Sequence, residues 1–185
     1  MNITLKIKIN KDSDILETIK QYTRALNYVS KTAFISNENV RNAVKLHKIY
    51  YDYVRETFNL PSQTSCSVFR DIAGKYKANK RKLKKAISFK ETHINYTYNK
   101  DFSIKNNVLG LSTINGRKKF VLDICDYYKE LLLKSTKYCD SSLVKDKKEQ
   151  VYFCLVIEIP ECEINNRGNT MGIDLGLSKL AVVST

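Results

Sequence analysis

The sequence predicts an α+β protein in which an antiparallel β-barrel is interrupted by a bundle of helices and followed by a separate hairpin. Residues 2–10 alternate apolar and polar side chains, which indicates a strand with one buried face. Residues 15–76 then carry apolar side chains at helical spacing, and from residue 93 the period of two returns. We therefore expect a β-barrel or sandwich of about six strands, built from residues 1–10 and 91–162, with residues 11–90 inserted as helices.

Three amphipathic helices are expected in the insertion. Asp14 and Glu17 have the spacing of a capping box, so the first helix should begin there. Asn39 is the expected cap of the second, which should end before Pro61, and the third should begin near Ser62. The apolar stripe expected for the second helix is Val40, Val44, His47, Tyr51, Val54 and Phe58, and that expected for the third is Cys66, Phe69, Ala73 and Tyr76.

The neighbouring tyrosines Tyr50, Tyr51 and Tyr53 could stack on nucleic-acid bases. At its helical spacing, Tyr51 is more typical of a core residue. Both interpretations stay open at this point.

Residues 74–90 form the most basic part of the chain and contain no acidic residue. Such a run repels itself unless an anion is bound, and phosphate is the natural partner. With Tyr76 and Phe89 interleaved, the composition favours contact with nucleic acid, while the alternative is a mobile, solvated linker. The candidate phosphate contacts in this run are Lys75, Lys80, Arg81, Lys84 and Lys85.

Short strands are expected from residue 93 onwards. Asn106-Asn107 and Asn115-Gly116 have the composition of hairpin turns, and residues 138–145 and 151–159 should pair across residues 146–149. Residues 126–133 fit either a short helix or a strand. Residues 163–170 have the composition of a linker to the final segment, residues 171–185.

A net charge of +13 favours an anionic partner, and nucleic acid is the commonest polyanion in the cytosol. The alternative is a lysine-rich surface that serves solubility. No apolar run is long enough to span a membrane and the start does not have the form of a signal peptide, so we expect a cytoplasmic protein.

The five cysteines are odd in number and have no Cys-x-x-Cys spacing. We expect reduced, mostly buried thiols and no zinc site. His47 and His93 lack neighbouring ligand residues in the sequence, so each is expected to be packed or solvated rather than catalytic.

Asp174 lies in the sequence Gly-Ile-Asp-Leu-Gly, residues 172–176. Alternation along a strand would bury Ile173 and Leu175 and project the carboxylate from the other face, and residues 179–183 could return as a second strand. Nucleases of the RNase H-like class hold Mg²⁺ on carboxylates in this setting, where paired metals stabilise the attacking and leaving oxygens. The alternative is an edge hairpin with a solvated aspartate.

This order of parts resembles the N-terminal half of the TnpB (OrfB) proteins of insertion sequences, which are RNA-guided DNA endonucleases related to type V CRISPR effectors. Residues 60–63, Leu-Pro-Ser-Gln, look like the start of the family's recognition-lobe helix. Residues 151–160 look like the end of its wedge domain, and residues 171–176, Met-Gly-Ile-Asp-Leu-Gly, look like its first RuvC motif.

The resemblance implies a recognition lobe in the helices, a wedge-like barrel, and the start of an RNase H-like domain at residues 171–185. Guide RNA and target DNA would be the partners, and Asp174 would be a catalytic ligand of Mg²⁺. Arg117 and Lys119 would contact phosphates, and Gln63 and Thr64 could reach base edges or cap their helix.

The chain stops at Thr185, before the family's other acidic ligands and its zinc ribbon. We therefore expect that this polypeptide alone does not cut DNA. The alternatives are a non-catalytic RNA- or DNA-binding truncation product and a decayed transposase remnant.

Overall fold

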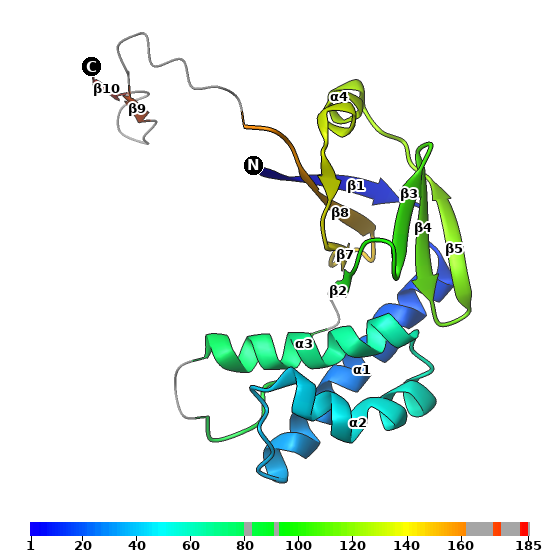
Figure 1. Cartoon of the computed structure of the whole chain (residues 1–185), viewed down its shortest axis with the longest axis vertical. Coiled ribbons are helices and arrows are strands. Elements are labelled where there is room, and N and C mark those ends of the chain that lie inside the picture. Colours follow the sequence, from blue (N-terminus) through cyan, green and yellow to red (C-terminus); the bar gives the residue numbers. More distant parts are fainter. Residues whose placement is uncertain (80–82, 91–92, 162–171, 175–181, 185) are drawn as a thin grey trace.

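The structure, a computed structural model, describes residues 1–79, 83–90, 93–161, 172–174 and 182–184. It is an α+β protein in which three helices lie together at one end of the strands, and α4 lies near the other end (Figure 1). The helices are α1 (Ser13–Ile35), α2 (Ala43–Phe58), α3 (Ser62–Ala78) and α4 (Asp126–Lys134). The strands are β1 (Asn2–Ile9), β2 (His93–Tyr96), β3 (Phe102–Lys105), β4 (Val108–Thr113), β5 (Gly116–Val121), β6 (Lys137–Tyr138), β7 (Ser141–Lys145), β8 (Val151–Glu158), β9 (Gly172–Asp174) and β10 (Val182–Ser184).

The strands before residue 161 form two antiparallel sheets. One has the order β1-β8-β7-β2, with β6 also paired to β8, and the other has the order β3-β4-β5. The predicted barrel closure is not seen among the described strands, because β1 and β2 stand at opposite edges of the first sheet. After β2, the chain passes through the bridge between Tyr98 and Phe102 into the second sheet. This second sheet packs against α1 and does not connect β2 to β1.

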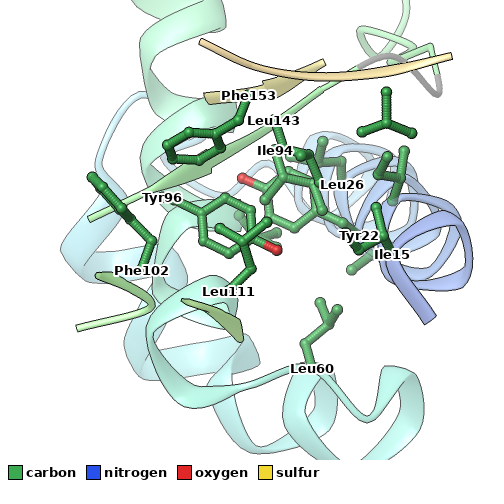
Figure 2. Close-up of a cluster of buried hydrophobic side chains, with 14 of the residues drawn as sticks. Ile15, Tyr22, Leu26, Leu60, Ile94, Tyr96, Phe102, Leu111, Leu143 and Phe153 are labelled. Carbon is green, nitrogen blue, oxygen red and sulfur yellow. The ribbon is translucent and has the colours of Figure 1, made fainter. Parts of the chain in front are cut away.

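One hydrophobic core joins the helices to both sheets. Phe153 of β8 and Leu143 of β7 lie on the inner face of the first sheet, and Phe102 and Leu111 come from the second (Figure 2). Tyr22 of α1 reaches into the same cluster and is fully buried. The alternating pattern of β1 and β8 buries every second residue, as a strand with one covered face requires.

The first helix is capped by Asp12 and not by the predicted Asp14. The carboxylate of Asp12 accepts hydrogen bonds from the backbone N–H groups of Asp14 and Ile15, at 2.9 and 3.2 Å. The prediction was wrong because Glu17 bonds Gln21 and pairs with Lys20, so it does not complete a capping box. Asp14 instead lies in the first helical turn.

The second helix begins later than predicted, with Asn42 as its cap in place of Asn39. Asn39 accepts from the N–H of Arg41 in the preceding turn. The buried face of α2 is Leu46, Tyr50, Val54 and Phe58, which recur every four residues. The predicted stripe was therefore wrong at four positions: Val40 precedes the helix, Val44 is 66% exposed, and His47 and Tyr51 are half-buried. The ring of His47 stacks on Tyr51, with centroids 4.5 Å apart, so it is packed as expected.

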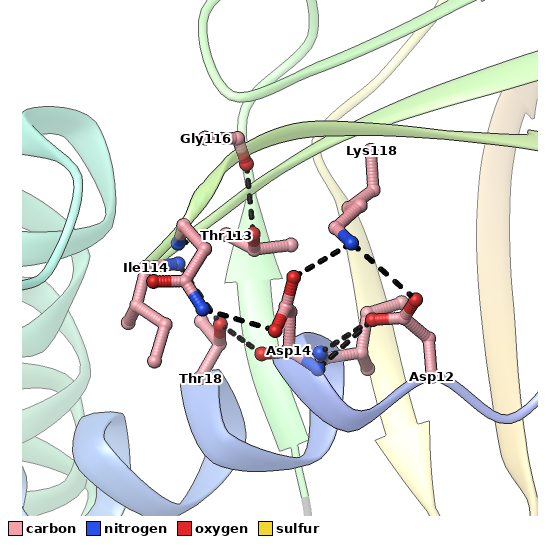
Figure 3. A network of polar contacts seen from close by, with 9 residues as sticks. Asp12, Asp14, Thr18, Thr113, Ile114, Gly116 and Lys118 are labelled. Carbon is pink, nitrogen blue, oxygen red and sulfur yellow. Dashed lines mark hydrogen bonds and ion pairs between the residues drawn. The ribbon is translucent and has the colours of Figure 1, made fainter.

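The β4–β5 hairpin is tied to the start of α1 by a polar network (Figure 3). Lys118 contacts the carboxylates of Asp14 at 2.7 Å and Asp12 at 3.8 Å. Asn115 donates to Asp14, and the N–H of Ile114 donates to Thr18 at 3.1 Å. The turn lies one residue before the predicted Asn115-Gly116 pair: Ile114 and Asn115 connect the strands, and Gly116, which pairs with Thr113, has a φ of 97° that suits glycine. These contacts fix the second sheet on the helical insertion.

The cysteines Cys66, Cys125, Cys139 and Cys154 are free thiols, as predicted. The prediction that most are buried was wrong: Cys125 is exposed and the other three are half-buried. Cys154, for example, takes an outward position on β8 between the buried Phe153 and Leu155. Cys162 lies outside the described residues.

Candidate nucleic-acid interface

Two adjoining clefts lie between α3 and the first sheet. The larger has a volume of about 590 Å³ and is bounded by α3, by residues 88–90 and by β2. The smaller, of about 300 Å³, continues between α3, β2 and β7. Arg70, Asp71 and Asn95 line both, so the two clefts form one basic cleft, a name used below for this site.

The basic cleft carries the cations Arg70 and Lys75 from α3 and Lys90 from the following segment. Arg70 is exposed and donates hydrogen bonds to the hydroxyls of Ser67, at 2.9 Å, and Thr97, at 3.2 Å. These bonds hold its guanidinium at the junction of the helix and the sheet. A planar cation fixed in this way suits the bidentate recognition of phosphate.

Asp71 is the acidic residue of the larger cleft, and both its oxygens are engaged. Tyr22 donates to Oδ2 at 2.7 Å and Asn95 donates to Oδ1 at 2.8 Å. Burial and the charge of Asp71 raise the pKa of Tyr22, so its hydroxyl stays protonated and keeps donating. Because its charge is partly neutralised by these donors, the carboxylate opposes an anionic ligand less than a free one would.

The basic segment after α3 is packed on the helices over residues 83–90, which excludes a solvated linker for that part. Tyr76, on α3, accepts from the N–H of Ile87 at 3.0 Å, and Ser30, on α1, donates to the carbonyl of Ile87 at 2.7 Å. Asn27 binds both backbone groups of Phe89. Tyr76 is buried, so it is not placed to stack on a base, whereas Phe89 is half-buried against the core and lines the larger cleft.

The other candidates from this run are placed differently. Lys75 lines the larger cleft, whereas Lys84 and Lys85 are exposed beside it on the packed segment and do not line it. Lys80 and Arg81 lie outside the described residues.

Gln63 and Thr64 line neither part of the basic cleft, but Gln63 contacts Thr97, which lines the smaller part. The amide of Gln63 donates to the hydroxyl of Thr97 at 3.3 Å, next to the donor from Arg70. Thr64 is fully buried, and its hydroxyl has no hydrogen-bond partner. Its side chain therefore faces the interior, and Pro61 rather than either residue stands at the N-cap of α3.

Arg117 and Lys119 are exposed on the outer face of β5, in the second sheet. Arg117 crosses the strand β4 to donate to Ser103 at 2.9 Å, and Gly110 lies beneath it. A β-carbon at Gly110 would stand 3.0 Å from Nε of Arg117, so the glycine provides the space for this crossing. The pair lines neither part of the basic cleft.

Asp174 ends the strand β9, which pairs with β10 as an antiparallel hairpin and sets Asp174 opposite Val182. The predicted hairpin is therefore present, with its second strand at residues 182–184. Within the described residues, no three His, Cys, Asp or Glu side chains form a group that could hold a metal ion.

Sequence reasoning missed four residues of the basic cleft: Arg70, Asp71, Asn95 and Thr97. Arg70 and Asp71 are adjacent opposite charges on a helix, a pattern that also describes any solvated helix face. Asn95 and Thr97 are ordinary outward positions of a strand and its end. What these four residues share is their place where α3 meets β2, and this meeting can be seen only in the folded structure.

No known protein family and no curated protein matches this sequence. None of the helices in the described part of the chain is long and apolar enough to cross a lipid bilayer.

Proposed function

We propose that this protein binds nucleic acid through the basic cleft, as the N-terminal portion of a transposon-encoded RNA-guided DNA endonuclease resembling the TnpB (OrfB) family. The observation that carries the proposal is the composition of the cleft. The cations Arg70, Lys75 and Lys90 line it, and of its two carboxylates Asp71 is engaged by two donors and Asp140 accepts from the hydroxyl of Thr97. Guide RNA and target DNA would be its partners, in the cytoplasm. The net charge of +13 supports an anionic partner of this kind.

The proposal assigns parts of the fold to parts of such an enzyme. Helices α1, α2 and α3 would be the recognition lobe, and the two antiparallel sheets would correspond to the wedge-like barrel. The hairpin of β9 and β10 would begin the RNase H-like domain. The position of the Gly-Ile-Asp-Leu-Gly motif, with Asp174 on the first strand of a hairpin, supports this last assignment.

Asp174 would contribute a carboxylate oxygen to a Mg²⁺ site, the ligand type that this ion prefers. Bound Mg²⁺ would stabilise the charge on the phosphodiester that is cut. One carboxylate does not by itself make such a site.

The binding proposal is tested by measuring the affinity of the full chain for a structured RNA between about 50 and 200 mM salt. With six to ten phosphate contacts, affinity should fall by about 10³- to 10⁵-fold over this range. The double reversal Arg70→Glu with Lys75→Glu should weaken binding of unrelated sequences alike, because phosphate contacts carry no sequence information.

The matched control is the double reversal Lys134→Glu with Lys137→Glu, which changes the net charge equally at exposed positions on α4 and β6. If both reversals weaken binding to the same extent, net charge and not the basic cleft holds the RNA, and the proposal fails. Guide-directed cleavage of a plasmid with Mg²⁺ that disappears in Asp174→Ala would support the nuclease assignment and contradict the expectation that this polypeptide alone does not cut DNA. Binding without cleavage agrees with that expectation and with the non-catalytic module alike.

A further inference from the structure

Two tyrosines form a stacked pair on the outer side of the helical insertion. Tyr28 of α1 and Tyr53 of α2 have ring centroids 4.6 Å apart and an interplanar angle of 17°. Phe58, which is buried, meets both rings, with centroids 6.1 Å from Tyr28 and 6.3 Å from Tyr53. The three rings hold one another in place, so the orientation of Tyr53 is fixed by packing.

Tyr53 remains 43% exposed although it takes part in this cluster. Tyr28 stacks on one face of its ring and Phe58 meets the ring edge-on, so the exposed fraction belongs to the part of the side chain that these two rings leave uncovered. An aromatic ring with one face packed and the other in water is a stacking platform, because a planar ligand can add to the open face with little loss of side-chain entropy. Its neighbours on α2 differ: Tyr50 is buried and Tyr51 stacks on His47.

Cations flank the pair along α1. Arg24 precedes Tyr28 by four residues and Lys31 follows it by three, so both lie on its face of the helix, about 6 and 4.5 Å away along the axis. Both are exposed, and in the described part of the chain neither forms an ion pair. The carboxylates Asp52 and Glu56 share a surface depression with Arg55 on α2.

We propose that the pair of Tyr28 and Tyr53 is a base-stacking site for an unpaired nucleotide of single-stranded nucleic acid, whose phosphates are held by Arg24 and Lys31. The proposal rests on the proposed function, because it names a second contact for the nucleic acid that the basic cleft binds. A stacked aromatic with cations on either side accepts any base, so the site selects strandedness and not sequence. A second copy of the chain is the less suitable occupant, because these cations and a net charge of +13 on each copy would repel.

The experiment measures fluorescence anisotropy of the full chain with ten-nucleotide oligouridine and oligothymidine. Tyr53→Leu retains apolar packing on Tyr28 and Phe58 but removes the ring. It should weaken binding between about 5-fold and about 150-fold, the range expected for loss of one stacked base. Tyr53→Phe, which keeps the ring, should bind within about twofold of the wild type, and Tyr51→Leu on the same helix is the matched control. Equal losses of affinity for the two oligonucleotides would mean that the site binds single-stranded RNA and DNA alike. A loss of affinity for oligouridine alone would mean that it binds RNA.

A second measurement does not depend on a folded variant. Oligouridine carrying 5-iodouridine, which crosslinks to aromatic rings stacked on it, should attach to Tyr53 or Tyr28 of the wild-type chain. Crosslinks confined to other residues would overturn the proposal, as would unchanged affinity in a folded Tyr53→Leu variant. If that variant instead abolishes self-association and leaves RNA affinity intact, the surface joins two copies and the proposal is wrong.

The two proposals fail separately. Weakened binding in the Arg70 and Lys75 reversal with unchanged binding in Tyr53→Leu leaves the proposed function standing and rejects the stacking site. Unchanged binding in both rejects both.

Discussion

Asn27 binds both backbone groups of Phe89: its Nδ2 donates to the carbonyl at 3.0 Å, and its Oδ1 accepts from the N–H at 2.8 Å. The side chain of Asn27, on α1, thus satisfies the backbone N–H and carbonyl of Phe89 in the way that a paired strand would. Because Ser88 and Lys90 flank Phe89, the same contact fixes the wall of the basic cleft that the segment provides. The charged segment is therefore placed by a neutral residue 62 positions earlier in the chain.

Replacing Asn27 with alanine should release this segment. The change removes two hydrogen bonds from half-buried backbone groups, which we expect to lower the free energy of unfolding by about 1–3 kcal/mol. Trypsin should also cut faster after Lys84, Lys85 or Lys90, since the segment opens locally before the domain unfolds. Urea unfolding and limited proteolysis measure the two effects.

Gln21→Ala is the control for this prediction, since within the described part of the chain the side chain of Gln21 is hydrogen-bonded to its helical neighbours Glu17 and Arg24. It should change the stability by less than about 0.5 kcal/mol and leave proteolysis unaltered. A variant Asn27→Ala that resists trypsin like the wild type would show that Ser30 and Tyr76 hold the segment without Asn27.

Tyr22→Phe tests the neutralisation of Asp71. The change removes the donor to Oδ2 and leaves Asn95 as the remaining donor, so more of the negative charge of Asp71 acts on the cleft. Stability should fall by about 1–2 kcal/mol, as for the loss of one hydrogen bond to a charged group. RNA affinity should fall as well, and more at low salt than at high salt.

Tyr96→Phe separates the two effects of that change. Tyr96 is equally buried, but its hydroxyl donates to the carbonyl of Ser112, in the second sheet. It should lower stability without changing RNA affinity. Loss of affinity in both variants would indicate that destabilisation, and not the charge of Asp71, weakens binding.

The strands and the third helix could be predicted from the sequence because their signals are local. β1 follows from strict alternation, and α3 begins at Ser62 as the preceding Pro61 requires. The first two helix starts were missed by two or three residues, since Asp12, Asp14, Asn39 and Asn42 are all good caps and tertiary contacts choose among them. One such contact is the ion pair between Lys118 and Asp14, two residues that lie more than a hundred positions apart in the sequence.

The basic cleft could be predicted only in part. Lys75 followed from the charge of its run, but the contribution of Arg70, Asp71 and Asn95 depends on the meeting of α3 with β2. The burial of Tyr76 could not be predicted for the same reason, because an aromatic residue between lysines has no local sign of burial. The stacked position of Tyr53 could not be predicted either, since its partner Tyr28 lies on another helix.

Two glycines should respond oppositely to alanine. Gly74 lies within α3, and a β-carbon there would meet no atom within 4 Å, so Gly74→Ala should raise stability by about 0.5–1 kcal/mol through lower backbone entropy of the unfolded chain. At Gly110 the new atom would stand 3.0 Å from Nε of Arg117 and 3.1 Å from Oγ of Ser103. Gly110→Ala should therefore displace Arg117 from Ser103.

Thermal unfolding compares the two variants, and the NMR signal of the Arg117 Nε–H reports the displacement. Arg117→Gln with Gly110→Ala is the matched double variant, because it removes the side chain that the methyl group meets. If Gly110→Ala costs as much in this background as alone, Arg117 is not the cause.

Asp101 should make stability depend on pH with an unusual sign. It is 1% exposed, its Oδ1 accepts from the N–H of Thr97, and its Oδ2 has no hydrogen-bond partner among the described residues. Burial raises the pKa of this carboxyl from 3.8 to about 6. Between these values the folded state binds more protons than the unfolded state, so the contribution of Asp101 to stability falls as the pH rises from about 4 to about 7.

Asp101→Asn keeps an acceptor for Thr97 and cannot ionise. Its stability relative to the wild type should therefore rise between about pH 4 and pH 8, by at most about 3 kcal/mol. Urea unfolding of both proteins across this range measures the difference, and the comparison cancels other carboxylates. Asp14→Asn is the opposite case, because Lys118 and Asn115 lower the pKa of Asp14. The ionised Asp14 therefore stabilises the wild type relative to this variant, and that stabilisation is lost as the pH falls. A constant difference between Asp101→Asn and the wild type would mean that Asp101 is charged in the folded protein throughout, with Arg70 supplying the compensation that Oδ2 otherwise lacks.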